Sequence, residues 1–133
     1  MPIHIGNDAN RPVQLFAKTF STSTDPYTFA TLSSSTWVAC IIHFDIVGTN
    51  PNASRWANSS IWVCSRDSGD WTVTNSSTPV SLSSGTSSLS HSINNTSDVV
   101  SFILDRSAGT AMEFTVSAKV INGSYGQTTF SLS

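Results

Sequence analysis

The sequence predicts an all-β fold, a single antiparallel β-sandwich domain with a jelly-roll-like character. No window of about a dozen residues keeps its apolar positions at helical spacing, whereas β-branched residues occur throughout the chain. Short apolar segments recur roughly every ten residues and are separated by clusters of Gly, Pro, Asn, Asp and Ser. Between about eight and ten short strands with this turn spacing are typical of sandwiches and jelly rolls.

Residues 1–14, MPIHIGNDANRPVQ, show no periodicity and are predicted to form an extended N-terminal arm, with the sandwich in residues 15–133. Two prolines, a glycine and two asparagines punctuate this segment. We expect such an arm either to fray or to dock on a neighbouring molecule. The arm residues expected to bind a partner are Ile3, His4, Ile5 and Arg11.

The strands are predicted from apolar segments bounded by turn residues. In chain order these segments are VQLFAKTF, TFATL, TWVACIIHFDI, SSIWVCSR, DWTVT, PVSL, SLSHSI, DVVSFIL, AMEFTVSAKV and QTTFSL. AMEFTVSAKV alternates strictly, so its apolar side chains from Met112 to Val120 share one dry face. TWVACIIHFDI is apolar on both faces from Trp37 to Ile42, which is typical of a central strand covered from both sides.

Hairpin turns are predicted at RDSGD, at DRSAGT and at Asn122–Gly123. The Asn-Gly dipeptide suits the two positive-φ positions of a type I′ turn. A strict two-residue loop there would pair Thr115 with Phe130 and would place the Phe130 ring on the polar face. One extra residue in the ladder would return this ring to the core, so we expect a β-bulge at Gly126.

The composition describes a folded domain with a polar and nearly uncharged surface. Charged residues make up 11% of the 133 residues, against about 25% in ordinary soluble domains. Ser and Thr supply about a third of the chain, yet a hydrophobic content of 38% with four Trp and seven Phe is enough for a core. We therefore expect one domain that folds without a metal or cofactor.

Charge and hydropathy disfavour several classes of function. The net charge of −2 arises from six basic and eight acidic residues without a cluster of Lys or Arg, which argues against nucleic-acid binding. Neither a run of about eighteen apolar residues nor a basic, apolar leader occurs, so we expect no membrane span and no signal peptide. In a reducing compartment Cys40 and Cys64 are expected to be buried free thiols; a disulfide is the alternative in an oxidising one.

Motifs for catalysis and metal binding are missing from the sequence. It holds no nucleophile elbow, metalloprotease helix, P-loop or dinucleotide fingerprint, and its three histidines lack metal-ligand spacing. His43 and Asp45 share one strand face and could imitate two-thirds of a catalytic triad beside a serine, although a structural role is favoured. Glu113 with Asp105 is a weak candidate for a glycosidase pair. We expect no catalytic residues, no metal site and no enzyme activity.

Three tryptophans in SRWANSSIWVCSRDSGDW belong either to the core or to a binding platform. Alternation in SSIWVCSR leaves open which face is buried, because both faces are partly apolar. A structural role is favoured for Trp62 and for Trp71, which is expected across from Arg66, whereas Trp56 is equally suited to exposure. If Trp56 is a platform for a sugar, the residues expected to bind the glycan are Trp56, Asn52, Asn58 and Asp70.

The surface composition indicates a protein that works in an assembly. Ser, Thr and Asn lose little side-chain entropy when they are immobilised, whereas fixing a Lys, Glu or Arg costs up to about 2 kcal/mol. The chain holds two Lys and one Glu, residue types that are depleted in interface cores. We therefore expect much of the surface to contact other subunits, and we expect a homo-oligomer.

A resemblance gives this assembly a context. With FDIVG, SIWVCSRDSGDWTV and MEFTVSAKVING, the chain resembles small β-sandwich virion proteins of tailed bacteriophages, among them capsid decoration or cement proteins and tail-fibre domains. The resemblance implies a non-enzymatic structural protein of the virion, made in the host cytoplasm, with capsid or other virion proteins as partners. A chain starting at Met1 without trimerising repeats favours a decoration protein that docks on the capsid shell and stabilises it. The alternative is a tail-fibre or receptor-binding module that binds carbohydrate.

Overall fold

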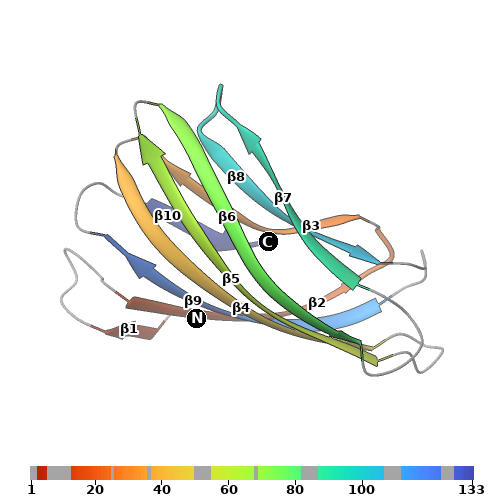
Figure 1. Ribbon diagram of the computed structural model, residues 1–133. Coiled ribbons are helices and arrows are strands. Elements are labelled where there is room, and N and C mark those ends of the chain that lie inside the picture. Colours follow the sequence, from red (N-terminus) through yellow and green to blue (C-terminus); the bar gives the residue numbers. More distant parts are fainter. Residues whose placement is uncertain are drawn as a thin grey trace.

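The computed structural model is a sandwich of two antiparallel β-sheets (Figure 1). It describes residues 3–5, 13–24, 26–35, 37–49, 55–67, 69–81, 87–106, 112–123 and 128–133. The larger sheet has strand order β1-β2-β9-β4-β5-β6, and the smaller sheet has strand order β10-β3-β8-β7. The predicted all-β sandwich is therefore confirmed. Within the described ranges, no helix is long and apolar enough to cross a membrane.

The strands follow the predicted segments with one merger. The larger sheet consists of β1 (Ile3–Ile5), β2 (Val13–Thr22), β9 (Met112–Asn122), β4 (Val38–Thr49), β5 (Arg55–Asp67) and β6 (Asp70–Ser81). The smaller sheet consists of β10 (Thr128–Leu132), β3 (Tyr27–Ser34), β8 (Val99–Arg106) and β7 (Ser87–Asn94). The predicted PVSL strand is instead the end of β6, because Pro79 and Val80 continue the pairing with β5.

The N-terminal segment adds a strand to its own sandwich. Ile3 lies opposite Leu15 and Ile5 lies opposite Val13, so β1 extends the edge of the larger sheet next to β2. The backbone of residues 3–5 therefore pairs within the chain, whereas we expected an arm that frays or reaches a neighbour. Arg11 lies outside the described residues.

Aromatic rings from both sheets form the centre of the core. Phe44 on β4 contacts Phe29 on β3 and Phe102 on β8, with ring centroids 5.1 Å apart in each pair. Trp62 on β5 packs edge-on against Phe102 at 5.3 Å. All four rings are buried, and burying a large apolar side chain stabilises the fold by about 1.5–3 kcal/mol. The rings therefore hold the two sheets together.

Alternation along the strands decides which side chains are inside. The apolar residues of β9 from Met112 to Val120 are buried at every second position, as predicted. β4 is central in the larger sheet but is covered on one face only, since Ile41 remains 40% exposed. The expectation of a strand covered on both sides was wrong. Its Trp37 end is open as well, with that side chain 67% exposed.

The predicted turns have different outcomes. RDSGD joins β5 to β6 as a hairpin, with Asp67 opposite Asp70 and Gly69 at a φ of 96°. The other two predictions were wrong, because DRSAGT leads from β8 in the smaller sheet to β9 in the larger sheet. The Asn-Gly segment likewise leads from β9 to β10, which belongs to the smaller sheet.

This crossover explains the position of Phe130 without a bulge. β10 pairs with β3, where Phe130 lies opposite Leu32 and is buried. Gly126, the expected bulge, lies outside the described residues. Gly123 has another role, because its amide donates to the Ala39 carbonyl at 2.7 Å and a Cβ built on it would lie 2.7 Å from that oxygen. Glycine permits this close approach of β9 to β4.

Candidate functional site

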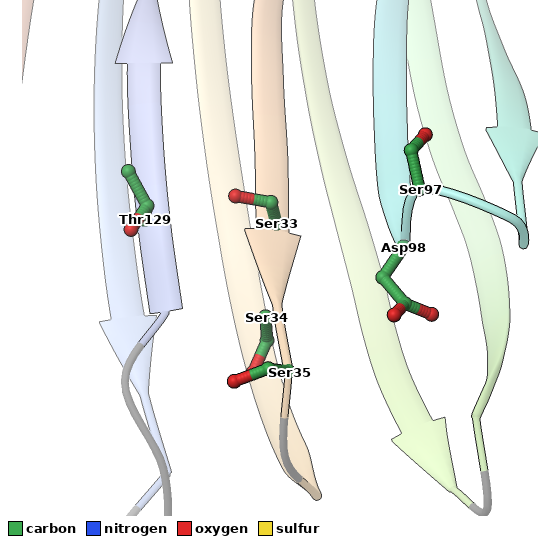
Figure 2. Close-up of a pocket in the computed structure, with 6 residues that line it drawn as sticks. All are labelled: Ser33, Ser34, Ser35, Ser97, Asp98 and Thr129. Atoms are coloured by element: carbon green, nitrogen blue, oxygen red, sulfur yellow. The ribbon is translucent and has the colours of Figure 1, made fainter.

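An open pocket lined by hydroxyl groups lies at one end of the smaller sheet (Figure 2). Its volume is about 310 Å³. The lining residues are Ser33, Ser34, Ser35, Ser97, Asp98 and Thr129. They come from β10, from the end of β3 and from the turn between β7 and β8, so the order of strands in the sheet brings them together.

Sheet register sets the spacing of the pocket hydroxyls. Thr129 lies directly opposite Ser33, and Ser33 lies opposite Val99 on the other side. Directly opposed residues have Cβ atoms about 4.5–5.5 Å apart. Ser33 and Thr129 therefore present two hydroxyl groups at a separation that one small polar molecule can span.

The turn between β7 and β8 is shaped by side-chain hydrogen bonds. Asn94 Oδ1 accepts from the amides of Thr96 and Ser97, at 3.0 and 3.2 Å. Asp98 follows with a φ of 59°, a left-handed conformation that Asp tolerates better than most residues. The Trp71 indole Nε1 donates to the Asp98 carbonyl at 3.1 Å, which ties the turn to β6.

Among the residues that the structure describes, Asp98 supplies the only carboxylate that lines this pocket. Arg66 Nη2 lies 3.1 Å from Asp98 Oδ1, and Arg66 Nε lies 3.4 Å from the same oxygen. The Arg66 side chain is 9% exposed, whereas that of Asp98 is 31% exposed. A nearly buried guanidinium thus holds one oxygen of a carboxylate that still reaches solvent. This partly exposed carboxylate can accept a hydrogen bond from a ligand in the pocket.

Trp37 is an exposed aromatic residue that lies near the pocket residue Ser35 in the chain, although it is not among the residues that line the pocket. It follows Ser35 by two residues, so the two Cα atoms are at most about 7 Å apart. Sequence reasoning missed Trp37, because the apolar run up to Ile42 indicated burial. The available signal was its place at the very start of that run, directly after a stretch of hydroxyl residues.

The predicted glycan-binding residues do not form one cluster. Asn58 is 4% exposed and faces the core, where its Oδ1 lacks a hydrogen-bonding partner within the described residues. Asp70 is exposed, but it lies opposite Asp67, nine positions from Asn58 along β5, or about 30 Å. Asn52 and the side chain of Trp56 lie outside what the structure describes. Asn58 and Asp70 therefore cannot contact the same sugar unit.

The other two tryptophans belong to the fold. Trp62 and Trp71 are 1% and 5% exposed, which confirms their structural role. Arg66 lies opposite Trp71 as expected, but the guanidinium pairs with Asp98. The arm residues Ile3, His4 and Ile5 are placed only as the backbone of β1, and their role in partner binding stays a prediction.

His43 and Asp45 meet Ser59 on the outer face of the larger sheet. His43 Nε2 lies 3.1 Å from Ser59 Oγ and 3.2 Å from Asp45 Oδ1, and Ser59 Oγ donates to Asp45 Oδ1 at 2.7 Å. In a catalytic triad the serine and the aspartate contact different ring nitrogens. Here one nitrogen contacts both, and the serine proton is directed to the carboxylate. The geometry therefore favours the structural role.

Two further chemical groupings are accounted for. Glu113 on β9 and Asp105 on β8 lie on different sheets, so they do not share a hairpin.

Cys40 lies opposite Cys64, and both are buried free thiols, as favoured from the sequence. The hydrogen bond with Cys40 and burial raise the pKa of Cys64 far above its ordinary range, so this thiol is unreactive at neutral pH. No group of three His, Cys, Asp or Glu side chains suited to a metal occurs in the described part.

Comparison with known proteins gives one structural relative. No protein-family model and no curated protein matches the chain. The fold is similar to that of the tailspike protein of Acinetobacter phage vB_ApiP_P1, with a TM-score of 0.50 and 16% sequence identity. The match covers 86% of this chain and 22% of the tailspike chain. The sandwich is thus similar in fold to a portion of a phage tailspike, whereas the expected capsid decoration role gains no support of its own.

Proposed function

We propose that this chain is a receptor-binding module of a phage tail, which binds a carbohydrate in the pocket around Asp98. The similarity in fold to part of a tailspike supports the setting. The observation that carries the binding site is a partly exposed carboxylate, fixed by Arg66, among the hydroxyl groups that line a single pocket. Under this proposal the chain is a virion component that associates with other tail proteins. This is the alternative given in the sequence analysis, a receptor-binding module that binds carbohydrate.

The chemistry of the pocket suits a sugar. Each sugar hydroxyl both donates and accepts hydrogen bonds, as do the hydroxyl groups of Ser33 and Thr129, while a carboxylate oxygen accepts them. The exposed indole of Trp37 offers an apolar ring for the C–H face of a pyranose. The Arg66 side chain holds the Asp98 carboxylate, and the Trp71 indole holds the Asp98 backbone carbonyl. Little conformational entropy is therefore lost at Asp98 when a ligand binds.

A neutral glycan fits this site better than an acidic one. The charge of Asp98 is directed at Arg66, and no other charged residue of the described ranges lines the pocket. A sugar carboxylate or sulfate would lie near the Asp98 carboxylate and would be repelled. We therefore propose an uncharged oligosaccharide as the ligand class.

We further propose that binding occurs without turnover. Glycoside hydrolysis commonly uses two carboxyl groups that flank the scissile bond. Asp98 is the only acidic residue lining the pocket in the described part of the chain, and its Oδ1 is paired with Arg66.

The test compares two Asp-to-Asn variants on β8 and its preceding turn. Asp98→Asn keeps the shape and the left-handed backbone but removes the charged acceptor, so we expect affinity for a neutral oligosaccharide to fall by about tenfold or more. Trp37→Ala should cause a similar loss. Candidate ligands are found on an array of neutral and acidic oligosaccharides, and affinities are then measured by titration calorimetry.

The matched control is Asp105→Asn, an exposed position about 23 Å further along the same strand, which should leave the affinity unchanged. Thermal melting of each variant shows whether the fold persists. Unchanged binding by folded Asp98→Asn and Trp37→Ala, or a preference of the wild type for acidic sugars, would contradict the proposed site.

A further inference from the structure

No described strand packs on the outer face of the larger sheet (Figure 1). This face carries exposed apolar side chains. We call the outward positions of its three central strands the outer patch. On β4 these are Ile41, His43, Asp45 and Val47; on β5 they are Val63, Ile61, Ser59 and Ala57; on β9 they are Ile121, Lys119, Ser117 and Thr115. The register places these residues in four rows that run across the strands.

The outer patch is wholly apolar in its first row and carries Lys119, His43 and Asp45 in its two middle rows. Four of the five exposed aliphatic residues, at positions 41, 61, 63 and 121, are 40–50% exposed, and Val47 is 58% exposed. A first row joins Ile121, Ile41 and Val63 as direct neighbours across three strands. A contiguous exposed patch of this kind marks an interaction surface rather than an ordinary soluble face.

The sequence of outward residues along β4 is self-complementary. Read in one direction it is Ile41, His43, Asp45, Val47, and read in the other it keeps apolar residues at both ends and a histidine–aspartate pair at the centre. A two-fold axis between His43 and Asp45, parallel to the rows, would place each histidine against the aspartate of a second copy. The same axis would place Ile41 against Val47 of that copy.

We propose that the outer patch docks on the outer patch of a second copy of this chain, about this two-fold axis. An isologous contact needs a surface that matches itself, and the β4 pattern meets this condition. Lys119 lies beside His43 in the same row, so in the dimer it flanks the second copy's aspartate at position 45. Lys119 of one copy therefore attracts Asp45 of the other copy across the interface.

The area available suits a weak dimer. The three strands of the outer patch span about 14 Å, and its four rows span about 27 Å along the strands, which gives about 390 Å² for each copy. The two copies together would bury about 780 Å², the size of a weak and transient contact. Sheets that pack face to face cross at about 30°, and residues near the axis stay in contact at that angle.

The first test measures mass in solution. Sedimentation velocity of the wild type from about 1 to about 200 µM should show a monomer that converts to a dimer. Ile41→Asp and Val63→Asp each bury an unpaired charge in the interface and should raise the dimer dissociation constant by about tenfold or more. The matched control is Thr31→Asp on the outer face of the smaller sheet, which should leave the dissociation constant unchanged.

The second test separates self-docking from any other use of the patch. His43→Asp carries carboxylates at both central positions, and Asp45→Lys places a lysine next to Lys119 of the second copy, so each variant alone should dimerise at least about tenfold more weakly. An equal mixture of the two brings opposite charges together and should recover a dimer close to wild-type affinity. Far-UV circular dichroism checks that both variants remain folded.

Three outcomes would overturn the proposal. They are a wild type that stays monomeric at the highest concentration, a dimer that survives Ile41→Asp and Val63→Asp, and a trimer as the smallest oligomer. Failure of the mixed variants to associate would overturn the two-fold axis between His43 and Asp45. None of these results bears on sugar binding by Asp98, so the two proposals stand or fall separately.

Discussion

The two sheets bury similar residues but present opposite chemistry to the outside. Across the outer face of the smaller sheet, one row of neighbours consists of Ser131, Thr31, Ser101 and Ser92. Across the outer face of the larger sheet, one row consists of Val13, Ile121, Ile41 and Val63. The first row holds hydroxyl groups alone, and the second holds aliphatic side chains alone.

This difference does not come from the needs of the fold. Both inner faces are apolar, and a sheet with one buried face is free to carry polar residues on the other. A row of Ser and Thr offers hydrogen bonds at low entropic cost, which suits a polar ligand. A row of Ile and Val offers area to remove from water, which suits a protein partner. The contrast therefore agrees with the two proposals, in which one face binds a ligand and the other binds a second copy.

The largest expected loss of stability comes from removing the ring of Phe44, which packs the two sheets together. Phe44→Ala deletes contacts to Phe29, Phe102 and Phe130, which lie on three strands of the smaller sheet, so we expect a loss of about 3–5 kcal/mol in the free energy of unfolding. Urea unfolding at neutral pH measures this. Phe16→Ala serves as the control, because Phe16 is only partly buried and should cost less. Equal losses for the two variants would contradict a core centred on Phe44.

Much of the fold could be predicted because strand patterns are local. The strict alternation of β9 fixed its buried face, and Gly69 in RDSGD identified a true hairpin. The partition of strands between the sheets could not be read this way. Asn122–Gly123 has the composition of a hairpin turn, yet β10 leaves for the smaller sheet, because pairing with β3 buries Phe130 there. Long-range packing outweighed the turn preference.

The candidate site was harder to predict because its residues are distant in sequence. Ser33, Asp98 and Thr129 meet only after β10, β3 and β8 have assembled in that order. The tryptophans misled for a related reason, since both faces of SSIWVCSR are partly apolar and only the partner sheet decides that Trp62 is inside. The apolar outer face that caused this ambiguity is the surface for which we propose a partner.

A smaller effect should follow from separating β9 from β4. Gly123→Ala would place a methyl group 2.7 Å from the Ala39 carbonyl oxygen, so the strands must shift, and we expect a loss of about 1–3 kcal/mol in stability. The shift also disturbs the neighbouring pair of Ile121 and Ile41, so dimerisation should weaken. Gly69→Ala is the control, since its positive φ makes it costly by about 1–2 kcal/mol without touching that row. Equal dimerisation by the two variants would mean that a shift at Gly123 does not disturb the pair of Ile121 and Ile41.

Exchanging one side chain on each outer face should have the smallest effect on stability. It is also the most direct test of whether the two outer faces have separate functions. Thr129→Val and Val63→Thr keep the branched shape, and both sites are exposed, so each should change the free energy of unfolding by no more than about 0.5 kcal/mol. Thr129→Val should weaken sugar binding by about fivefold, the value of one hydrogen bond, and should leave dimerisation intact. Val63→Thr should do the reverse. Because the sites lie on opposite outer faces, the double variant should show both losses additively in calorimetry and sedimentation. A loss of sugar binding caused by Val63→Thr would mean that the two faces are coupled and that their division of labour is wrong.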